Sequence, residues 1–143
     1  MTKNTFKKEY LCIVEGILDK KTGIIDLPIA RKPGSIIERY VNSTGQPSKT
    51  IYEVVKEFQI HSQNDIKSLS LVKCKLETGR THQIRVHFCH IGHPLLGDTL
   101  YGSPSPFISR QALHSYMVSF IHPVTKKEQC FTCPLPNDMK HLI

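Results

Sequence analysis

The sequence lacks the features that would mark a membrane-spanning, secreted or disulfide-held protein. No apolar run approaches the roughly 18–20 residues that a membrane span needs, and no charged-then-apolar signal peptide opens the chain. The cysteines number 5, an odd count without framework spacing, which is typical of a reducing compartment rather than of secretion. We therefore expect a cytoplasmic protein with no membrane partner.

Motifs of several common enzyme classes are also missing. The glycines do not fall in the GxxxxGK[ST] or GxGxxG patterns that wrap phosphates, and there is no HExxH pattern of a zinc protease. The aspartates are scattered through loop-like segments and form no evident glycosidase-like pair of carboxylates. Repeats, low-complexity tracts and internal linkers are absent as well. The sequence therefore favours one folded unit over a modular or repetitive protein.

What the sequence does have is an ordinary globular composition with an excess of positive charge. The 143 residues are 39% hydrophobic and 22% charged, and the chain is long enough for one domain with a core. Lys and Arg total 19 against 12 acidic residues, which gives a net charge of +7 with neutral histidines. Such a balance suits nucleic acid, an anionic membrane surface or an acidic protein as a partner. Because no strongly amphipathic basic helix appears, we favour nucleic acid.

Strand patterns outnumber helix patterns along the chain. Apolar, β-rich runs predict strands over residues 10–18, 50–58, 68–77, 112–121 and 128–133, the last two joined by a hairpin at HPVTKK. Stretches that are short, polar or rich in Gly and Pro predict loops over residues 19–35, 42–49, 61–67 and 92–106, the first of them with one short extended piece. A helix is predicted over residues 81–91, because Ile84, Phe88 and Ile91 recur on one face and Thr81 can cap the first turn. This order predicts an α+β fold, with a mixed, mainly antiparallel sheet and one or two packed helices.

The start of the predicted helix carries an unusual charge. Arg80, His82 and Arg85 lie in or beside its first turn, where the helix dipole disfavours cations by about 0.3–1 kcal/mol each. An anion at this position would remove the conflict, so we expect something negative to lie there. From the residues alone a structural reading stays open, in which the two arginines are solvated or pair with Glu77.

Histidine and cysteine clusters are weaker candidates for chemistry. Four histidines lie in a short stretch: His82, His87, His90 and His93. Only His87 and His90 would share a helical face, and no cysteine pair completes a zinc set, so hydrogen-bonded polar or RNA-facing histidines are favoured over metal ligands. Cys130 and Cys133 form a lone CxxC in a predicted strand, whereas a redox CxxC belongs at a helix start. Two half-buried hydrophobic residues are the favoured interpretation of that pair.

Three stretches carry a family resemblance. The longest is TGRTHQIRVH…GHPLLGDTLYG; the others are KEYLCIVEG and ALHSYMVSFIHPVTKK, the latter followed by CPLPNDM. They resemble the motifs of the RluA-type pseudouridine synthases, which isomerise uridine in RNA. KEYLCIVEG is similar to that family's K-x-Y-x-A-x-V-x-G strand, with Cys12 at the usual alanine. The resemblance covers Lys7 to Met139, nearly the whole chain.

The resemblance implies roles for individual residues. Tyr10 would stack on the target base and is a candidate for proton transfer, and Arg85 would pair with the catalytic aspartate. Leu113 would line the base pocket. A strand-edge tyrosine, a surface arginine and a core leucine are the structural alternatives. Substrate or RNA contacts are expected from Arg80, Thr81 and His82. No cofactor is implied, because the isomerisation has no redox step.

One part of the family pattern is missing. The catalytic aspartate of the family belongs to an H-R-L-D-x-x-T-S-G motif before the tyrosine strand, and none of the aspartates here has that context. We therefore interpret residues 1–143 as a single partial domain, the C-terminal portion of a pseudouridine synthase catalytic domain. It is expected to be inactive alone and to need the N-terminal half as its partner. Half a sheet exposes an unpaired edge, so self-association is also expected.

Three functional hypotheses follow. The leading one is the C-terminal part of an RNA pseudouridine synthase that acts on ribosomal or transfer RNA. The alternatives are a non-catalytic basic RNA-binding module and a histidine-metal hydrolase. Retention of both Tyr10 and Arg85 favours the synthase, since a binding module needs neither in particular. A hydrolase of the third kind would hold stoichiometric metal.

Overall fold

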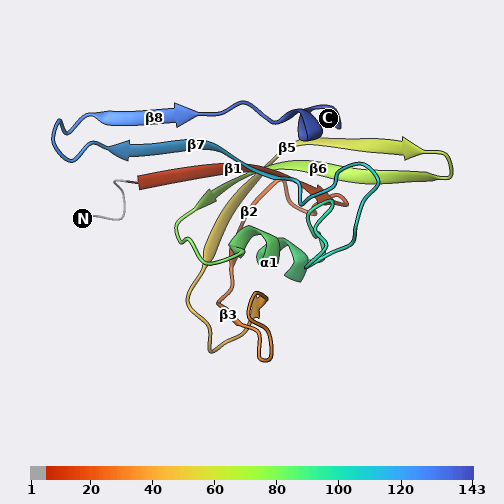
Figure 1. Ribbon diagram of the computed structural model, residues 1–143, viewed down its shortest axis with the longest axis horizontal. Helices are drawn as coiled ribbons and strands as arrows, with labels where there is room; N and C mark the ends of the chain where they lie inside the picture. The colour runs from red at the N-terminus through yellow and green to blue at the C-terminus, as the bar shows by residue number, and fades with distance from the viewer. Residues whose placement is uncertain (1–5) are drawn as a thin grey trace.

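The computed structural model describes residues 6–143, and its centre is one six-stranded sheet. Its strands follow the order β2-β5-β6-β1-β7-β8, and every described pairing is antiparallel. The predicted α+β class, with a mainly antiparallel sheet and two helices, is confirmed (Figure 1). The elements are β1 Phe6–Glu15, β2 Thr22–Asp26, β3 Ile29–Arg31, β4 Arg39–Val41, β5 Lys49–Ser62, β6 Asp65–Leu76, α1 Gln83–His90, β7 Leu113–Ile121, β8 Glu128–Thr132 and α2 Asn137–Lys140.

β1 lies at the centre because its sequence can be buried on both faces. Cys12, Ile13 and Val14 are all 0% exposed. A continuous apolar run is typical of a strand with neighbours on both sides and cover on both faces. Cys12 lies opposite Val72 of β6 on one side and Leu113 of β7 on the other. β1 therefore brings three distant parts of the chain together.

Successive residues of β1 contribute to two separate cores, since neighbouring side chains of a strand point to opposite faces. Cys12 packs in a cluster with Ile84 and Phe88 of α1. Ile13 packs in the other cluster, to which Met139 of α2 belongs. The two helices thus cover opposite faces of the sheet. Neither helix of the described part is long and apolar enough to cross a membrane.

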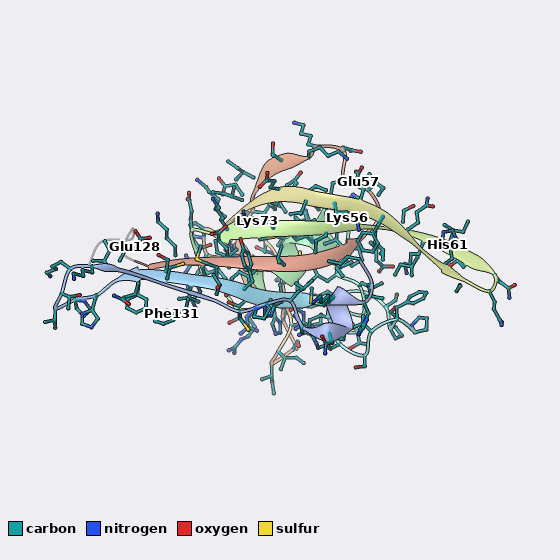
Figure 2. The ribbon with its side chains drawn as sticks, turned by 90° about the horizontal axis from the view of Figure 1, so that it is seen from above. Lys56, Glu57, His61, Lys73, Glu128 and Phe131 are labelled. Atoms are coloured by element: carbon teal, nitrogen blue, oxygen red, sulfur yellow. The ribbon has the colours of Figure 1, made fainter. Side chains whose placement is uncertain are left out.

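β5 and β6 form a longer hairpin than the sequence predicts. The loop predicted over residues 61–67 is only a tight turn, because Ser62 is already paired with Asp65. The pairing of β6 with β1 ends at Leu69, so the rest of the hairpin projects as two strands (Figures 1 and 2). The prediction was wrong because this ribbon has little to cover it, and its strands carry the polar residues that are typical of a loop.

The segment over residues 19–35, predicted as a loop with one short extended piece, contains two short strands. β2 extends the sheet along β5, and β3 pairs with β4 in a small second sheet near α1 (Figure 1). Gly45 lies against β3, where an added Cβ would come within 2.5 Å of the Ile29 carbonyl carbon. Only glycine allows this close approach. The β3–β4 hairpin is therefore contacted by α1 on the β4 side and by the Gly45 turn on the β3 side.

The sheet face away from α1 carries charged side chains on β5 and β6. Figure 2 looks down on this side and labels Lys56 on β5 and Lys73 on β6. Lys73 lies 3.8 Å from a carboxylate oxygen of Glu9, and Glu57 pairs with Lys21. Exposed pairs of this kind contribute about 0–1 kcal/mol. The other face, which α1 covers, holds the predicted functional residues.

Candidate functional site

α1 begins two residues later than predicted and without the predicted cap. The residue before it, His82, has a left-handed backbone with φ of 57°, and no side-chain hydrogen bond from a capping residue is made, by Thr81 or otherwise. The predicted apolar face is correct at Ile84 and Phe88, which are 4% and 0% exposed. Ile91 lies beyond the helix end and is 36% exposed. Left-handed backbone is uncommon for a residue with a side chain, and here it turns the preceding segment away from the helix axis.

A buried glutamine fixes that preceding segment. Gln83 is 2% exposed, and its amide makes four hydrogen bonds. Its Oε1 accepts from the Thr78 hydroxyl at 2.7 Å and from the backbone N–H of Arg80 at 3.1 Å. Its Nε2 donates to the Lys49 carbonyl at 2.9 Å and to the Thr50 hydroxyl at 3.0 Å. The segment that carries Arg80 is therefore tied to the start of β5.

The same network continues to a buried histidine. His87 is 0% exposed, with Nδ1 2.8 Å from the Thr50 hydroxyl and Nε2 2.9 Å from the Leu27 carbonyl. A carbonyl only accepts, so Nε2 carries the proton and Nδ1 accepts from Thr50. Burial lowers the pKa of His87, although the hydrogen bond to Leu27 opposes the change. His87 is thus an internal link rather than an RNA-facing group.

Arg85 grips a carboxylate of this same chain. Its Nε and Nη2 donate to Oδ2 and Oδ1 of Asp98, each at 2.8 Å. Asp98 is 0% exposed and also accepts the backbone N–H groups of Leu100 and Tyr101, both at 3.1 Å. Sequence reasoning found no partner for Arg85 among the aspartates. The sequence feature that could have indicated Asp98 is the GHPLLGD segment. Aspartate is a frequent first residue of a turn, where its carboxylate accepts backbone N–H groups and is held in a fixed position.

This pair stays ionised in the folded protein. Burial by itself would raise the pKa of Asp98, but hydrogen bonds from Arg85 and from the N–H groups of Tyr101 and Leu100 bring it below its ordinary value. The hydrogen bond to Asp98 raises the pKa of Arg85. A guanidinium has five N–H donors, of which Asp98 takes two. One edge of Arg85 is therefore held, and the other donors are left for a second partner.

Tyr101 connects Arg85 with the helix entry and with β4. Its ring centroid lies 5.1 Å from the Arg85 Cζ, within the range of a cation–π contact. Its hydroxyl accepts the backbone N–H of Arg39 at 3.0 Å and lies 2.7 Å from Nδ1 of His82. We infer that the hydroxyl donates to a neutral His82, because burial and the charges of Arg85 and Arg39 lower the pKa of that imidazole. One hydroxyl thus joins three segments.

Tyr10 and Leu113 lie on the α1 face, at the margin of the same apolar cluster. Burial raises the pKa of the Tyr10 hydroxyl. Tyr10 lines a cavity of about 290 Å³ together with Leu76 and Arg80. Neither Arg85 nor Leu113 is among the residues that line this cavity. The structure therefore brings Tyr10 together with Arg80. Leu113 packs beside the apolar cluster, and Arg85 is directed toward Asp98.

Arg80 also faces a second cavity, of about 400 Å³, between the β3–β4 hairpin and the segment before α1. Its Nε and Nη2 both donate to the Pro47 carbonyl, at 3.0 and 2.9 Å, which fixes the plane of the guanidinium. Thr81 lines the same cavity. The residues expected to contact RNA thus divide into Arg80 and Thr81, which line a hollow, and His82, which is turned toward Tyr101.

The remaining histidines and the CxxC pair form no common centre. His93 has its Nδ1 2.8 Å from the Glu15 carbonyl, and His90 is exposed. Within residues 6–143, no group of three or more His, Cys, Asp and Glu side chains is arranged to hold a metal ion. Cys130 and Cys133 are both exposed rather than half-buried. The prediction for them was wrong because β8 is an edge strand.

Sequence reasoning missed most of the residues that organise the site. They are polar, and they lie inside the motif itself: Gln83, Asp98 and Tyr101. For His87 the sequence did indicate a hydrogen-bonded polar role, but not its partners Thr50 and Leu27. Gln83 and His87 are four residues apart and share a helix face beside the apolar one. Polar residues at that spacing could have suggested a buried hydrogen-bond network, because a buried polar group needs a partner.

Known proteins match nearly the full length of this chain. The family model described as RNA pseudouridylate synthase matches residues 1–90. An uncharacterized RNA pseudouridine synthase of Bacillus subtilis (strain 168), YjbO, is 48% identical over 137 residues, which are 96% of this chain and 46% of that protein. Ribosomal large subunit pseudouridine synthase D of Escherichia coli (strain K12) is 36% identical over 157 residues, covering 100% of this chain and 45% of that protein.

Two solved human structures share the fold. RNA Pseudouridylate Synthase Domain Containing 1 superposes with a TM-score of 0.76 at 26% identity, over 94% of this chain and 58% of that one. RNA Pseudouridylate Synthase Domain Containing 4 gives a TM-score of 0.67 at 21% identity, over 95% and 60%; at that identity it supports the fold alone. The chain spans about half the length of the curated relatives it matches.

Proposed function

Because this chain belongs to the RNA pseudouridylate synthase family, we propose that it forms the C-terminal portion of a catalytic domain that isomerises uridine to pseudouridine in RNA. The observation that carries the proposal is the placement of two distant motifs. Tyr10 of β1 points to the sheet face on which α1, the helix of Arg85, is packed. The Escherichia coli relative is named as a ribosomal large-subunit enzyme, so ribosomal RNA is the first substrate to test, before transfer RNA. A ribosomal RNA substrate is consistent with the cytoplasmic location expected from the sequence.

We assign the target base to the region beside Tyr10. The reaction breaks the C–N glycosidic bond of uridine, rotates the uracil and rejoins it through carbon, so the nucleotide must leave its stack. An aromatic ring offers a face on which a flipped base can stack. The raised pKa of Tyr10 keeps its hydroxyl protonated at neutral pH, where it can exchange a proton with the base. Leu113, across β1 from Val72, supplies apolar surface on the same side.

We assign to Arg85 the role of binding and orienting the catalytic carboxylate. Such a carboxylate must stay ionised while it is partly desolvated, and a neighbouring guanidinium lowers its pKa and orients it. Asp98 takes the Nε and Nη2 donors and so fixes the direction of the remaining ones. Asp98 itself is unsuited to the chemistry, because it is 0% exposed and both its oxygens already accept hydrogen bonds.

The catalytic aspartate is proposed to come from outside these 143 residues. They contain no H-R-L-D-x-x-T-S-G motif, and the chain spans less than half of its relatives. An N-terminal half that carries this motif is the partner proposed to complete the domain. No cofactor is part of the proposal, since bonds are exchanged without net oxidation.

Activity of the separate and joined chains tests the proposal. We expect the 143 residues alone to form no detectable pseudouridine in ribosomal or transfer RNA transcripts. Joined to a segment with the H-R-L-D motif, they should become active without added metal or nucleotide. Tyr10→Phe should lower the rate about 10²–10⁴-fold if the hydroxyl moves a proton. Arg85→Ala should lower the rate about 10²–10³-fold, and Arg85→Lys should restore part of it, because lysine keeps the charge without the planar grip.

Arg110→Ala is the matched control, because Arg110 forms the same kind of two-point pair with Asp138 away from the site. It should leave the rate within a few-fold of the parent. A joined protein that folds and binds RNA yet makes no pseudouridine would overturn the proposal in favour of a binding module. Normal turnover by the 143 residues alone would show that one of their own aspartates is the catalytic group.

A further inference from the structure

Three of the arginines in this chain surround the cavity of about 400 Å³ beside the β3–β4 hairpin. Arg31 and Arg39 come from the hairpin, and Arg80 comes from the segment before α1. The lining also includes the polar side chains of Thr44 and Thr81 but no acidic residue. A hollow with several cations and no carboxylate is an unpaired positive site.

The pairing of the hairpin makes this charge costly. Arg31 and Arg39 lie directly opposite each other in the β3–β4 register, and like charges in such positions are destabilising. The Arg31 side chain makes no hydrogen bond or ion pair with any residue of the described part. The acidic residues on the adjoining segments pair with lysines: Glu38 with Lys32 at 3.0 Å and Glu77 with Lys49 at 3.6 Å. The charge is therefore left for an external anion.

Two of the three cations, Arg80 and Arg39, are also held in place before any ligand arrives. Two donors of Arg80 are fixed on the Pro47 carbonyl. The Arg39 Nη1 donates to the Ile37 carbonyl at 3.1 Å, while its backbone N–H is bound by the Tyr101 hydroxyl. Donors that are fixed in advance lose less conformational freedom when they bind. This arrangement is typical of a site built to receive an anion.

We propose that Arg31, Arg39 and Arg80 form a subsite for a phosphate group of the RNA backbone. Guanidinium groups match phosphate oxygens with two-point, charge-assisted hydrogen bonds. The 290 Å³ cavity at Tyr10 and this 400 Å³ cavity are both lined by Gly79 and Arg80. A strand whose target base lies at Tyr10 would thus place a neighbouring phosphate at the arginines. The choice of RNA as the source of the phosphate rests on the proposed function.

Inorganic phosphate tests the subsite independently of any RNA. In NMR spectra of the ¹⁵N-labelled arginine Nε–H groups, phosphate should shift Arg31, Arg39 and Arg80 with one saturating curve, and uridine without phosphate should leave them unchanged. Arg110, whose Nε donates to Asp138 at 2.9 Å, is the internal control and should not move with them. Equal, non-saturating shifts of all arginines would overturn the subsite.

Binding of a labelled oligouridylate tests the source of the phosphate. Arg31→Gln and Arg39→Gln should each weaken binding about tenfold, as expected for loss of a charged hydrogen bond. Each should also lower the slope of log K against log salt by about 0.7, the value for one contact with a single strand. Arg110→Gln makes the same change in net charge and should weaken binding less than about twofold. Circular dichroism of each variant checks that the fold is kept.

The outcomes separate this inference from the proposed function. If Arg110→Gln weakens oligouridylate binding as much as Arg31→Gln does, only net charge matters and the subsite is overturned. If phosphate shifts the three arginines but oligouridylate binding ignores Arg31→Gln, the RNA backbone is not the ligand and the proposal fails. If both binding tests succeed while the joined protein makes no pseudouridine, the subsite stands and the proposed activity fails.

Discussion

At the scale of single residues, the chain holds two arginine–aspartate pairs with nearly the same geometry and very different surroundings. In the Arg85–Asp98 pair the side chains are 13% and 0% exposed. In the Arg110–Asp138 pair they are 38% and 41% exposed, and the hydrogen bonds are 2.9 and 3.0 Å long. Removing one partner of a buried pair leaves an uncompensated charge, whereas water screens an exposed one. The two pairs should therefore differ strongly in their contribution to stability.

Asp98→Asn should lower the free energy of unfolding by about 3–5 kcal/mol, the usual effect of breaking a buried ion pair. Asp138→Asn makes the same chemical change and should cost about 0–1 kcal/mol. Urea unfolding of the two variants and the parent measures both values. Similar losses in the two variants would contradict the buried role assigned to Asp98.

At the scale of elements, α1 is anchored by polar side chains as well as by its apolar face. Gln83 and His87 connect it to Thr50 of β5, and His87 also reaches Leu27 after β2. His87 is neutral in this network, because its Nδ1 must accept the Thr50 proton. Protonation of His87 would place two donors face to face unless Thr50 turned its own proton away. The packing of α1 should therefore depend on pH.

The expected direction follows from the lowered pKa of His87, caused first by burial. The unfolded chain takes up the proton first, so this stability is present above about pH 6.5 and is lost as the pH falls through the folded pKa. His82, also with a lowered pKa, adds in the same direction. Melting temperatures should thus fall between pH 7.5 and 5.5. His87→Gln should reduce this fall, and His61→Gln, at an exposed position of β5, should not; an unchanged fall in His87→Gln would refute the assignment.

The elements differ in how far the sequence alone could predict them. β1 and α1 were predicted because burial leaves a clear apolar pattern, continuous at Cys12–Val14 and helical at Ile84 and Phe88. The β3–β4 hairpin was not predicted, since strands of three residues are too short to show a periodicity. Their position depends on the close approach of Gly45 to β3, which the local sequence does not reveal.

The candidate site shows the same division. The charge at Arg80 and Arg85 predicted a negative partner, and Arg85 does hold one. The sequence could not identify that partner as Asp98, because the two residues meet through the fold of the irregular segment after α1. Which of these residues touch substrate stays a prediction.

At the scale of the whole molecule, one edge of the sheet is open. β8 is the last strand of the sheet, and Phe131 on it is 59% exposed while Val124 in the preceding turn is 80% exposed. Figure 2 shows Phe131 at the outer edge of the sheet. An edge strand with exposed apolar side chains is a template for pairing with another chain. We therefore predict that the self-association expected from the sequence uses this edge.

Sedimentation velocity at rising protein concentration measures this association. The 143-residue chain should shift toward a dimer, and Phe131→Lys should shift it back to the monomer, because a charge on an edge strand opposes pairing. Val55→Lys is the matched control, since Val55 is 54% exposed but lies on β5, an inner strand. A parent chain that stays monomeric at all concentrations would count against this edge as an interface.

The central position of β1 also determines the order in which the protein can form. Residue 12 is paired with residues 72 and 113, so the middle strand of the sheet is made by the ribosome long before either neighbour. Such contacts have a high contact order, because the entropy of closing long loops is lost before any pairing compensates for it. β1 cannot gain its second neighbour during synthesis until β7 has left the exit tunnel. Until then β1 can pair only with β6, and its apolar residues on the other edge stay open to contacts that lead to aggregation.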